Sequence, residues 1–570
     1  MSVIPAKAGI QGIVAKYDLA QFIENLRFYD LIPRNLLRSY KDSSCDIYMS
    51  ENTRVIKAAG VVGASTLLSR IFGFIRDVVI AWFFGAGLSS DAFFVAFRIP
   101  NLLRRLLAEG SLSIAFIPVF TECLTNQGKN EAFKLARSAI RLLSAILVIT
   151  VIIGIFLSPI IIRIIAPGFT VSPEKFSLTV TLTRIMFPYI FFIGLVAICM
   201  SILNALGHFA APALAPVFLN FAMICAVLFI SPHMAEPVTG LAIGVLIGGF
   251  LQLAFQLPFL IKKGFYFWEK TKTYHPMLKK VGLLMLPTVF GAAVYQINIL
   301  IGTLLASLLP EGSVSYLYYA DRLVQFPLGI FAIATATAVL PSLSRQASAQ
   351  DYDSLRDTFA YAMRLILFIT IPSMVGLIVL REPIVELLFK RGAFDAETTR
   401  LTASALLYYG IGLWAFSAVR IVVSTFYALQ DTKTPVRMAA ISVVANIIFS
   451  IILMQYLGHS GLALATSLSS MLNFWLLVRA LKVKLGLSGW KGITESTCKT
   501  MAGSFIMGAV VWAIALLIIP SGDKTLISLF FGLMGSIFAG LVFYGSFSFF
   551  IRSPELEKVL AIVKKSMRIK

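Results

Sequence analysis

The stretch that decides the fold class is LLSAILVITVIIGIFLSPIII, residues 142–162. Its 21 residues include no charged side chain. An α-helix rises about 1.5 Å per residue, so a run of this length crosses the roughly 30 Å hydrocarbon core of a bilayer. Similar apolar runs alternate with short polar breaks from residue 60 to residue 550. The pattern predicts a chain that crosses a membrane many times.

The composition of the whole chain agrees with this prediction. Hydrophobic residues make up 58% of the 570 residues, charged residues only 14%, and the mean hydropathy is +0.86. A soluble domain is about 45–50% apolar and about 25% charged. These values exclude a water-soluble or disordered chain. The net charge of +21 does not indicate a nucleic-acid partner, because cytoplasmic loops of membrane proteins collect Lys and Arg.

The apolar runs predict an all-α polytopic protein with about fourteen transmembrane helices. A helical reading follows because lipid-exposed backbone must satisfy its own hydrogen bonds, and no alternating barrel pattern is present. We expect spans near residues 61–83, 90–121, 142–165, 177–204, 212–230, 239–261, 281–306, 314–341, 359–380, 400–428, 436–457, 461–478, 500–519 and 526–550.

Loop charges predict the orientation of these spans. With this helix count, one set of alternate loops carries 25 Lys and Arg, whereas the other set carries 6. The six are Arg163, Lys175, Arg381, Lys390, Arg391 and Lys524. Because basic loops stay in the cytoplasm, we expect loops 262–280 and 479–499 and both termini to be cytoplasmic, with loop 381–399 outside.

An internal repeat divides the chain. Several markers recur at an offset of 221–223 residues: Pro118 and Pro341, Ala205 and Ala428, Pro212 and Pro435, and Gly240 and Gly461. Equal numbers of spans in equal orientation make this a parallel repeat. We therefore expect a six-helix lobe over 49–261, a second over 262–482, and two further helices with a cytoplasmic tail over 483–570. Residues 1–48 are expected to be an extension that precedes a biological start at Met49.

Enzyme and metal motifs are absent from the sequence. It has no GxxxxGK[ST] loop, no GxSxG elbow and no HExxH pair. The five cysteines form no CxxC pair, and the four histidines lie far apart. We expect no metal site, no cofactor and no catalytic residues.

The spans instead contain charge, most of it positive. The first two spans and the eighth carry Arg70, Arg76, Asp77, Asp91, Arg98, Arg104, Arg105, Glu109, Asp321 and Arg322. An Arg at the centre of a span costs about 2.5–3.5 kcal/mol on insertion scales. Three readings stay open: snorkelling to the headgroups, structural ion pairs such as Arg70 with Asp77 or Asp321 with Arg322, and a site for an anionic ligand. The surplus of arginines favours the anion, because guanidinium forks suit phosphate.

Two other classes of function fit the residues less well. A cation-coupled drug antiporter is expected to place carboxylates where this chain places arginines. A membrane-bound glycan polymerase or glycosyltransferase needs acid and base groups or long outer loops, whereas the outer loops here are short. The residues alone indicate an exporter of an anionic amphiphile.

The sequence also resembles a known family. The motifs that carry the resemblance are Ser69-Arg70-Ile71-Phe72-Gly73-Phe74-Ile75-Arg76-Asp77, Phe84-Gly85-Ala86-Gly87, Asp91-Ala92-Phe93-Phe94, Pro100-Asn101-Leu102-Leu103-Arg104-Arg105, Ala108-Glu109-Gly110, Tyr318-Tyr319-Ala320-Asp321-Arg322 and Lys433-Thr434-Pro435-Val436. They are similar to those of the MurJ (MviN) lipid II flippases of the MOP exporter superfamily. The resemblance runs from about Met49 to the C-terminal region.

The resemblance implies two six-helix lobes around a central cavity, with the last two helices forming a groove for a lipid tail. It implies transport of lipid II, the undecaprenyl-diphosphate-linked peptidoglycan precursor, by alternating access across the bacterial inner membrane. The implied substrate-binding residues are Arg70, Arg76, Arg104 and Arg322. Supporting polar and acidic residues are Ser69, Asp77, Asp91, Arg105, Glu109 and Asp321.

The resemblance also bears on energy coupling and partners. Some relatives are thought to use sodium in the second lobe, but here the seventh span has Asn298 and no carboxylate. Membrane potential is therefore the expected drive, and sodium coupling stays open. Cell-wall synthesis proteins are the partners that such a role implies. A flippase for another undecaprenyl-linked glycan and a multidrug antiporter of the same superfamily are the alternatives.

Overall fold

The computed structural model describes residues 60, 62–106, 112–269, 274–486, 490–519 and 525–557. The chain separates into two units, Met1–Leu67 and Leu68–Lys570. In the first unit the described residues, 60 and 62–67, are helical. The expected extension over residues 1–48 lies outside the described residues.

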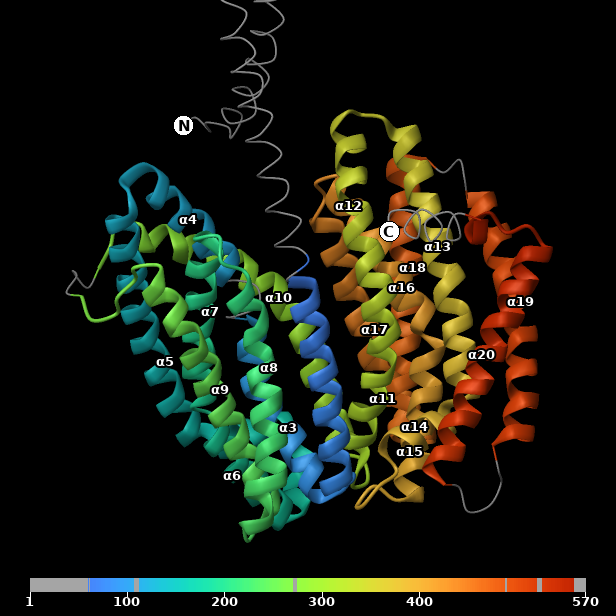
Figure 1. Cartoon of the computed structure of the whole chain (residues 1–570), viewed down its shortest axis with the longest axis horizontal. Helices are drawn as coiled ribbons and strands as arrows, with labels where there is room; N and C mark the ends of the chain where they lie inside the picture. The colour runs from blue at the N-terminus through green and yellow to red at the C-terminus, as the bar shows by residue number, and fades with distance from the viewer. Residues whose placement is uncertain are drawn as a thin grey trace, which may run out of the picture. The chain divides into compact units, whose positions relative to one another are not determined.

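The described part of the second unit is all-helical and has no strand (Figure 1). A helix over residues 68–84 comes first. The first half continues with α3 (Leu88–Leu106), α4 (Leu112–Gln127), α5 (Lys129–Ile165), α6 (Pro173–Met186), α7 (Tyr189–Ala205), α8 (Ala210–Cys225) and α9 (Pro237–Lys262). The second half comprises α10 (Leu278–Ser307), α11 (Ser313–Pro327), α12 (Ile333–Ser348), α13 (Tyr352–Val379), α14 (Arg381–Phe389), α15 (Ala396–Ile411), α16 (Leu413–Ala428), α17 (Lys433–Leu457) and α18 (His459–Leu485). The chain ends with α19 (Trp490–Ile518) and α20 (Leu526–Phe550).

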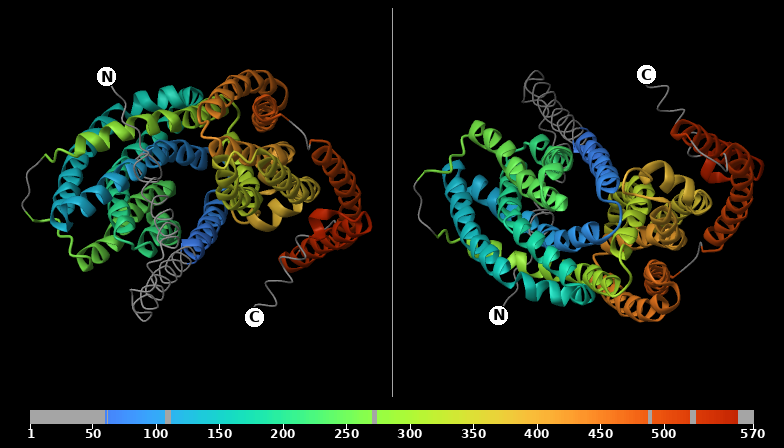
Figure 2. Two further views of the ribbon diagram at one scale, coloured as in Figure 1. Left: turned by 90° about the horizontal axis from the view of Figure 1, so that it is seen from above. Right: turned by 90° about the horizontal axis from the view of Figure 1, so that it is seen from below.

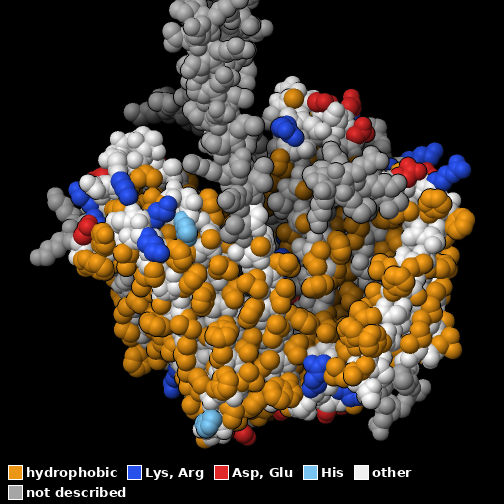
Figure 3. All heavy atoms as spheres, viewed as in Figure 1, with side chains coloured by type: hydrophobic (Ala, Val, Ile, Leu, Met, Phe, Trp, Pro, Cys, Tyr) orange, Lys and Arg blue, Asp and Glu red, His pale blue; other side chains and the backbone are white. Residues whose placement is uncertain are grey.

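Ten helical stretches of the described residues are long and apolar enough to cross a membrane, and α15 with α16, bent by 40°, makes up to eleven. Figure 3 shows hydrophobic side chains over the middle of the visible face, with Lys and Arg side chains toward its ends. The chain is therefore a multi-pass membrane protein. The expected spans over 61–83, 90–121 and 281–306 are not among these described stretches, although part of the third is a shorter apolar helix, Gln296–Ser307. The count of fourteen stays a prediction.

The predicted repeat is visible in the helix bounds. Helices α7 and α16 end at Ala205 and Ala428, and α8 and α17 begin at Ala210 and Lys433, each pair 223 residues apart. The packing repeats as well. Helix α8 packs on α9 as α17 packs on α18, and α3 packs on α6 as α11 packs on α15. The two halves therefore share one architecture, as expected for a parallel repeat.

The last two helices attach to the second half. Helix α19 packs along α13 and α20, and α14 also contacts α20. In both views of Figure 2 these two helices (red) lie side by side. Helix α10 contacts α3, α4 and α5 as well as α17, so it joins the two halves.

Two details differ from the sequence analysis. The outer loop expected over 381–399 contains the nine-residue helix α14. Lys175, counted among the loop charges, lies in the first turn of α6 and is only 7% exposed. Ser172 caps this helix through its side chain, and Pro173 occupies its first turn. Because the helix starts there, Lys175 points into the protein rather than into a loop.

Candidate functional site

The carboxylate of Asp77 lies between two guanidinium groups. On its own helix, Arg76 Nη2 and Nε donate to Asp77 Oδ1 over 2.6 and 3.0 Å. From α11, Arg322 Nε lies 3.2 Å from Asp77 Oδ2. The side chains of Asp77 and Arg76 are almost fully enclosed, whereas that of Arg322 is 32% exposed. One carboxylate thus holds two cations, and one of those cations is accessible.

Two neutral side chains complete this cluster. The Tyr318 hydroxyl donates to Asp77 Oδ1 (3.1 Å) and accepts from Arg322 Nη2 (3.0 Å). Its ring stacks on Phe94 of α3, with 3.9 Å between centroids. Asn220 of α8 accepts from Arg76 Nη1 (3.0 Å) and donates to the carbonyl of Ser69 (3.2 Å). We call Arg76, Asp77, Asn220, Tyr318 and Arg322 the arginine cluster.

The two ion pairs considered in the sequence analysis differ from those found. Asp77 pairs with Arg76 and Arg322 rather than with Arg70. Asp321 accepts a hydrogen bond from Gln325, while its neighbour Arg322 turns toward Asp77. The cause is Tyr318, which lies one turn before Arg322, where positions four apart on a helix face each other. Its hydroxyl ties the guanidinium to Asp77.

The other predicted site residues differ in their surroundings. Asp321 is within electrostatic reach of Arg98 and Arg105 of α3 as well as Arg322. Arg104 Nε donates to Asn101 Oδ1 over 3.1 Å. Glu109 lies outside the described residues.

Arg70 reaches the junction of α11 and α12 instead of Asp77. Its guanidinium lies against Gly329, where an added Cβ would fall 1.9 Å from Nη1. Gly329 belongs to a π-helical turn, Leu328–Ala332. Such turns are frequent at functional sites.

Asp91 belongs to a separate structure at the start of α3. Its Oδ2 accepts from Lys175 Nζ and from the Gly312 backbone N–H, both over 2.8 Å. Its Oδ1 accepts from the backbone N–H (3.0 Å) and hydroxyl (2.7 Å) of Ser315. In return, Glu311 Oε1 accepts from the Leu88 N–H over 2.7 Å. Each helix start therefore receives a carboxylate from the opposite half, which satisfies N–H groups that a helix leaves unpaired. We call this structure the α3–α11 cap.

The two charged structures differ in their charge balance. Around Asp77 and Asp321 stand four arginines, Arg76, Arg98, Arg105 and Arg322. This surplus suits an anion that accepts several hydrogen bonds, above all phosphate. In the described residues no group of three or more His, Cys, Asp or Glu could hold a metal ion.

Sequence reasoning missed Tyr318, Asn220, Lys175 and Gly329 as site residues. A polar side chain inside an apolar span was the available signal for Asn220. The position one turn before Arg322 was the signal for Tyr318. No signal marked Lys175, because its place in a loop followed from the predicted span boundaries.

The family profile and the relatives that match this chain carry the same description. The family profile described as Lipid II flippase MurJ matches residues 80–532. A probable lipid II flippase MurJ of Vibrio cholerae is 41% identical over 474 residues, which cover 80% of this chain and 89% of the relative. The lipid II flippase MurJ of Burkholderia cenocepacia is 38% identical, with 75% of this chain and 84% of the relative covered.

Solved structures agree with these relatives. A lipid II flippase MurJ in an inward closed conformation matches with a TM-score of 0.73 and 31% identity, covering 86% of this chain and 99% of that one. An inward-facing multidrug resistance MATE family transporter of the MOP superfamily matches with a TM-score of 0.63 at 16% identity, which shows the fold alone. The match to more than half of the chain, and relatives above 30% identity along most of their length, lead to one conclusion: this chain belongs to the lipid II flippase MurJ family.

Proposed function

We propose that this chain moves lipid II from the inner to the outer leaflet of the bacterial cytoplasmic membrane. The arginine cluster carries this proposal, because it sets an accessible guanidinium beside a surplus of positive charge within a set of apolar helices. Lipid II combines a diphosphate with a long apolar tail, so it matches both features. Membership of the family supports the same substrate.

Arg322 is the residue that we assign to the diphosphate first. Its guanidinium has five N–H donors in a planar fork, and the contacts with Asp77 and Tyr318 use Nε and Nη2. The Nη1 side is the part that a phosphate oxygen would take. Arg76 is enclosed by Asp77, Asn220 and Tyr318 and acts as a positioning residue. Arg70, Arg104 and Arg105 supply further positive charge.

The α3–α11 cap supports alternating access between the two halves. Asp91 and Lys175 belong to the first half, whereas Gly312 and Ser315 belong to the second. Opening at this end must expose the buried Asp91–Lys175 pair to water and uncap α11. Closing restores those contacts. The repeat supplies two similar lobes that can rock against each other around the arginine cluster.

Topology is part of the proposal. The basic loops face the cytoplasm, both termini are cytoplasmic, and the α3–α11 cap faces outward. An impermeant thiol reagent applied to intact cells should label a cysteine at Arg391 in a cysteine-free background, but not one at Lys263. Lys272, in the same cytoplasmic loop, lies outside the described residues. Labelling of Lys263→Cys in sealed cells would reject this topology.

Membrane potential drives transport in this proposal. Each charge moved through 100 mV yields about 2.3 kcal/mol. Support comes from the meeting point of α10, α17 and α18, where Asn446 Nδ2 donates to Asn298 Oδ1 (2.9 Å) and Ser469 Oγ bonds Asn446 Oδ1 (3.4 Å). Such neutral groups bind sodium less strongly than carboxylates do. Proteoliposomes with a potassium diffusion potential should transport equally with and without sodium, and a strict sodium requirement would reject this drive.

Depletion of the protein tests the proposed function most directly. Cells that hold this chain as their single flippase should lose the labelling of lipid II on the outer leaflet as the protein is depleted. Wild-type protein from a plasmid should restore that labelling, and Arg322→Ala should not. Unchanged exposure of lipid II after depletion would reject the function.

The same proposal includes complexes of this chain with cell-wall synthesis proteins.

A further inference from the structure

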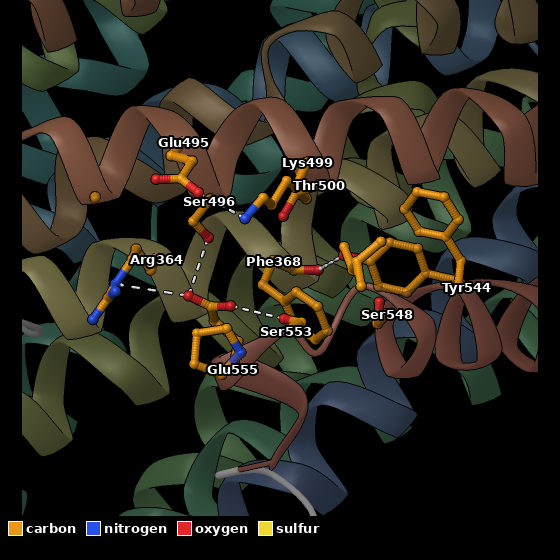
Figure 4. Close-up of a pocket in the computed structure, with 14 residues that line it drawn as sticks. Arg364, Phe368, Glu495, Ser496, Lys499, Thr500, Tyr544, Ser548, Ser553 and Glu555 are labelled. Carbon is orange, nitrogen blue, oxygen red and sulfur yellow. Dashed lines mark hydrogen bonds and ion pairs between the residues drawn. The ribbon is translucent and has the colours of Figure 1, made fainter.

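A polar cavity lies at the opposite edge of the second half from α3. Its volume is about 130 Å³, and it lies between α13, the start of α19, and the end of α20 with the turn that follows (Figure 4). A single water needs roughly 10–15 Å³ by the same measure. The cavity therefore has room for a small polar group rather than for one water. None of its lining residues belongs to the arginine cluster or the α3–α11 cap.

The lining offers two cations and two carboxylates. Glu555 is 3% exposed, and its oxygens accept from Ser496 (3.0 Å) and Ser553 (2.8 Å). Arg364 lies 3.7 Å from Glu555, which is too far for a hydrogen bond, and its buried Nε has no hydrogen-bond partner among the described residues. Lys499 and Glu495 pair with each other at the exposed rim (2.7 Å). The cavity thus holds an unused guanidinium donor beside a carboxylate.

The cavity lies where apolar helices give way to polar chain. The apolar helix α20 ends at Phe550, and Ser553 and Glu555 follow within one or two turns. At the same end of α20, Phe549 and Phe550, which are not part of the cavity lining, are 70% and 84% exposed. In a membrane protein, such a border between apolar and charged surface lies at the level of the lipid headgroups. A ligand with a charged head and apolar chains can use both surfaces.

We propose that this cavity binds the headgroup of a phospholipid that carries a primary ammonium group. The phosphate takes the exposed part of the Arg364 guanidinium, whose side chain is 28% exposed, and the ammonium of Lys499. The lipid ammonium, with three N–H donors, takes the carboxylates of Glu555 and Glu495. The acyl chains lie along α20 over Phe549 and Phe550. This headgroup site shares no lining residue with the arginine cluster and does not depend on it.

Three lipids with equal acyl chains show whether binding requires an ammonium group with N–H donors. Phosphatidylethanolamine has both groups, phosphatidylcholine has a cation without N–H donors, and phosphatidylglycerol has no cation. Purified full-length protein is offered each lipid in detergent, and retained lipid is measured by native mass spectrometry. We expect one phosphatidylethanolamine retained about tenfold more strongly than either of the others, since charge-assisted hydrogen bonds are the strong ones. Equal retention of the three lipids would overturn the proposal.

Single substitutions test the assigned partners. Arg364→Met should lower retention of phosphatidylethanolamine about tenfold. In Glu555→Gln, the retention of phosphatidylethanolamine divided by that of phosphatidylcholine should fall close to one. Arg345→Met is the matched control, because Arg345 is exposed on α12 outside the lining and should retain lipid as the wild type does. Unchanged retention by folded Arg364→Met, or an unchanged ratio in folded Glu555→Gln, would contradict the assignment.

Two further measurements test whether the variants fold and whether the ligand is a lipid or a free phosphate ester. If either buried substitution lowers the amount of monodisperse protein, Lys499→Met decides, because this side chain is 52% exposed. Weaker retention by Lys499→Met supports the site, and retention equal to wild type overturns it. Soluble O-phosphoethanolamine carries the same headgroup without chains. We expect it to compete poorly, and competition as strong as that of the lipid would show a site for a free phosphate ester instead.

Discussion

The arginine cluster and the α3–α11 cap share only helix α11 among the described residues, and they differ in how their charges are satisfied. In the cap, Asp91 is 1% exposed, and its two oxygens accept four hydrogen bonds from Lys175 and the start of α11. In the cluster, one carboxylate serves two guanidiniums, and Arg322 remains 32% exposed. A balanced, enclosed structure holds the protein in one conformation. A structure with surplus, accessible donors binds a ligand.

Loss of the shared carboxylate should have the largest effect. Asp77→Asn leaves the accessible Arg322 and the enclosed Arg76 without their shared counter-charge, and an unpaired buried charge costs about 3–5 kcal/mol. We expect a large drop in monodisperse protein and in the thermal midpoint. Asp353→Asn is the control, because that side chain is 92% exposed and pairs only with Arg356 on the surface. Equal stability of Asp77→Asn and wild type would show that the cluster does not depend on Asp77.

A bridge across the cap should stop transport without unfolding the protein. In a cysteine-free background, cysteines at Asp91 and Ser315 joined by a short thiol crosslinker would hold the two halves together at this end. Flipping in proteoliposomes should fall to background when the bridge forms and return to the level of the unbridged double-cysteine protein when a cleavable bridge is cut. Ser404 and Ser460 provide the matched pair within the second half, with 2.9 Å between their hydroxyls. Full activity with the Asp91–Ser315 bridge formed would contradict the role of the cap.

A smaller change should separate Arg70 from the cluster. Gly329→Ala places a methyl group against the end of a flexible side chain, so Arg70 moves aside and the fold is kept. We expect normal protein amounts and a reduction of transport by about two- to fivefold, less than one full charged hydrogen bond. Gly376→Ala on α13 is the control, because its added Cβ meets nothing within 4 Å. Transport unchanged by Gly329→Ala would exclude Arg70 from the site.

The smallest effect concerns the carboxylate of Asp431, which pairs with Lys484 and serves as a reference for the cluster and the cap. The hydrogen bond from Lys484, together with those from Thr434, lowers the pKa of Asp431, in the loop between α16 and α17. A depressed pKa adds stability above the unfolded value, about 3.9, and that stability is lost as the pH falls through the folded value. Thermal midpoints between pH 7 and pH 3 should therefore fall more steeply for wild type than for Asp431→Asn. If the thermal midpoints of wild type and Asp431→Asn fall in parallel with pH, the Asp431 pair does not contribute to stability.

The repeat and the charged positions could be predicted from the sequence, for a physical reason. Proline and glycine mark helix ends and kinks. Pro118 in α4 and Pro341 in α12 are therefore separated by the same 223 residues as the equivalent helices of the two halves. A charge inside an apolar run is costly, so Arg76, Asp77 and Asp91 stood out without any knowledge of their neighbours.

The partners of those charges could not be predicted. Asn220 is 144 residues from Arg76, Lys175 is 84 residues from Asp91, and Tyr318 is 241 residues from Asp77. Such contacts depend on which helix faces pack together, and apolar periodicity in a membrane span does not give this. Helix α14 was missed because nine residues are too few for a clear pattern.

The affinity of the purified protein for lipid II reports directly on whether the arginine cluster binds the diphosphate. Wild type, Arg322→Ala, Arg322→Lys and the exposed control Arg345→Ala are compared at equal folded amounts. We expect Arg322→Ala to bind about tenfold to a hundredfold more weakly, since charged hydrogen bonds contribute about 1.5–3 kcal/mol each. Arg322→Lys keeps the charge but loses the fork and should fall between the two, while Arg345→Ala should match wild type. Wild-type affinity in folded Arg322→Ala would contradict the assignment of the arginine cluster to the diphosphate.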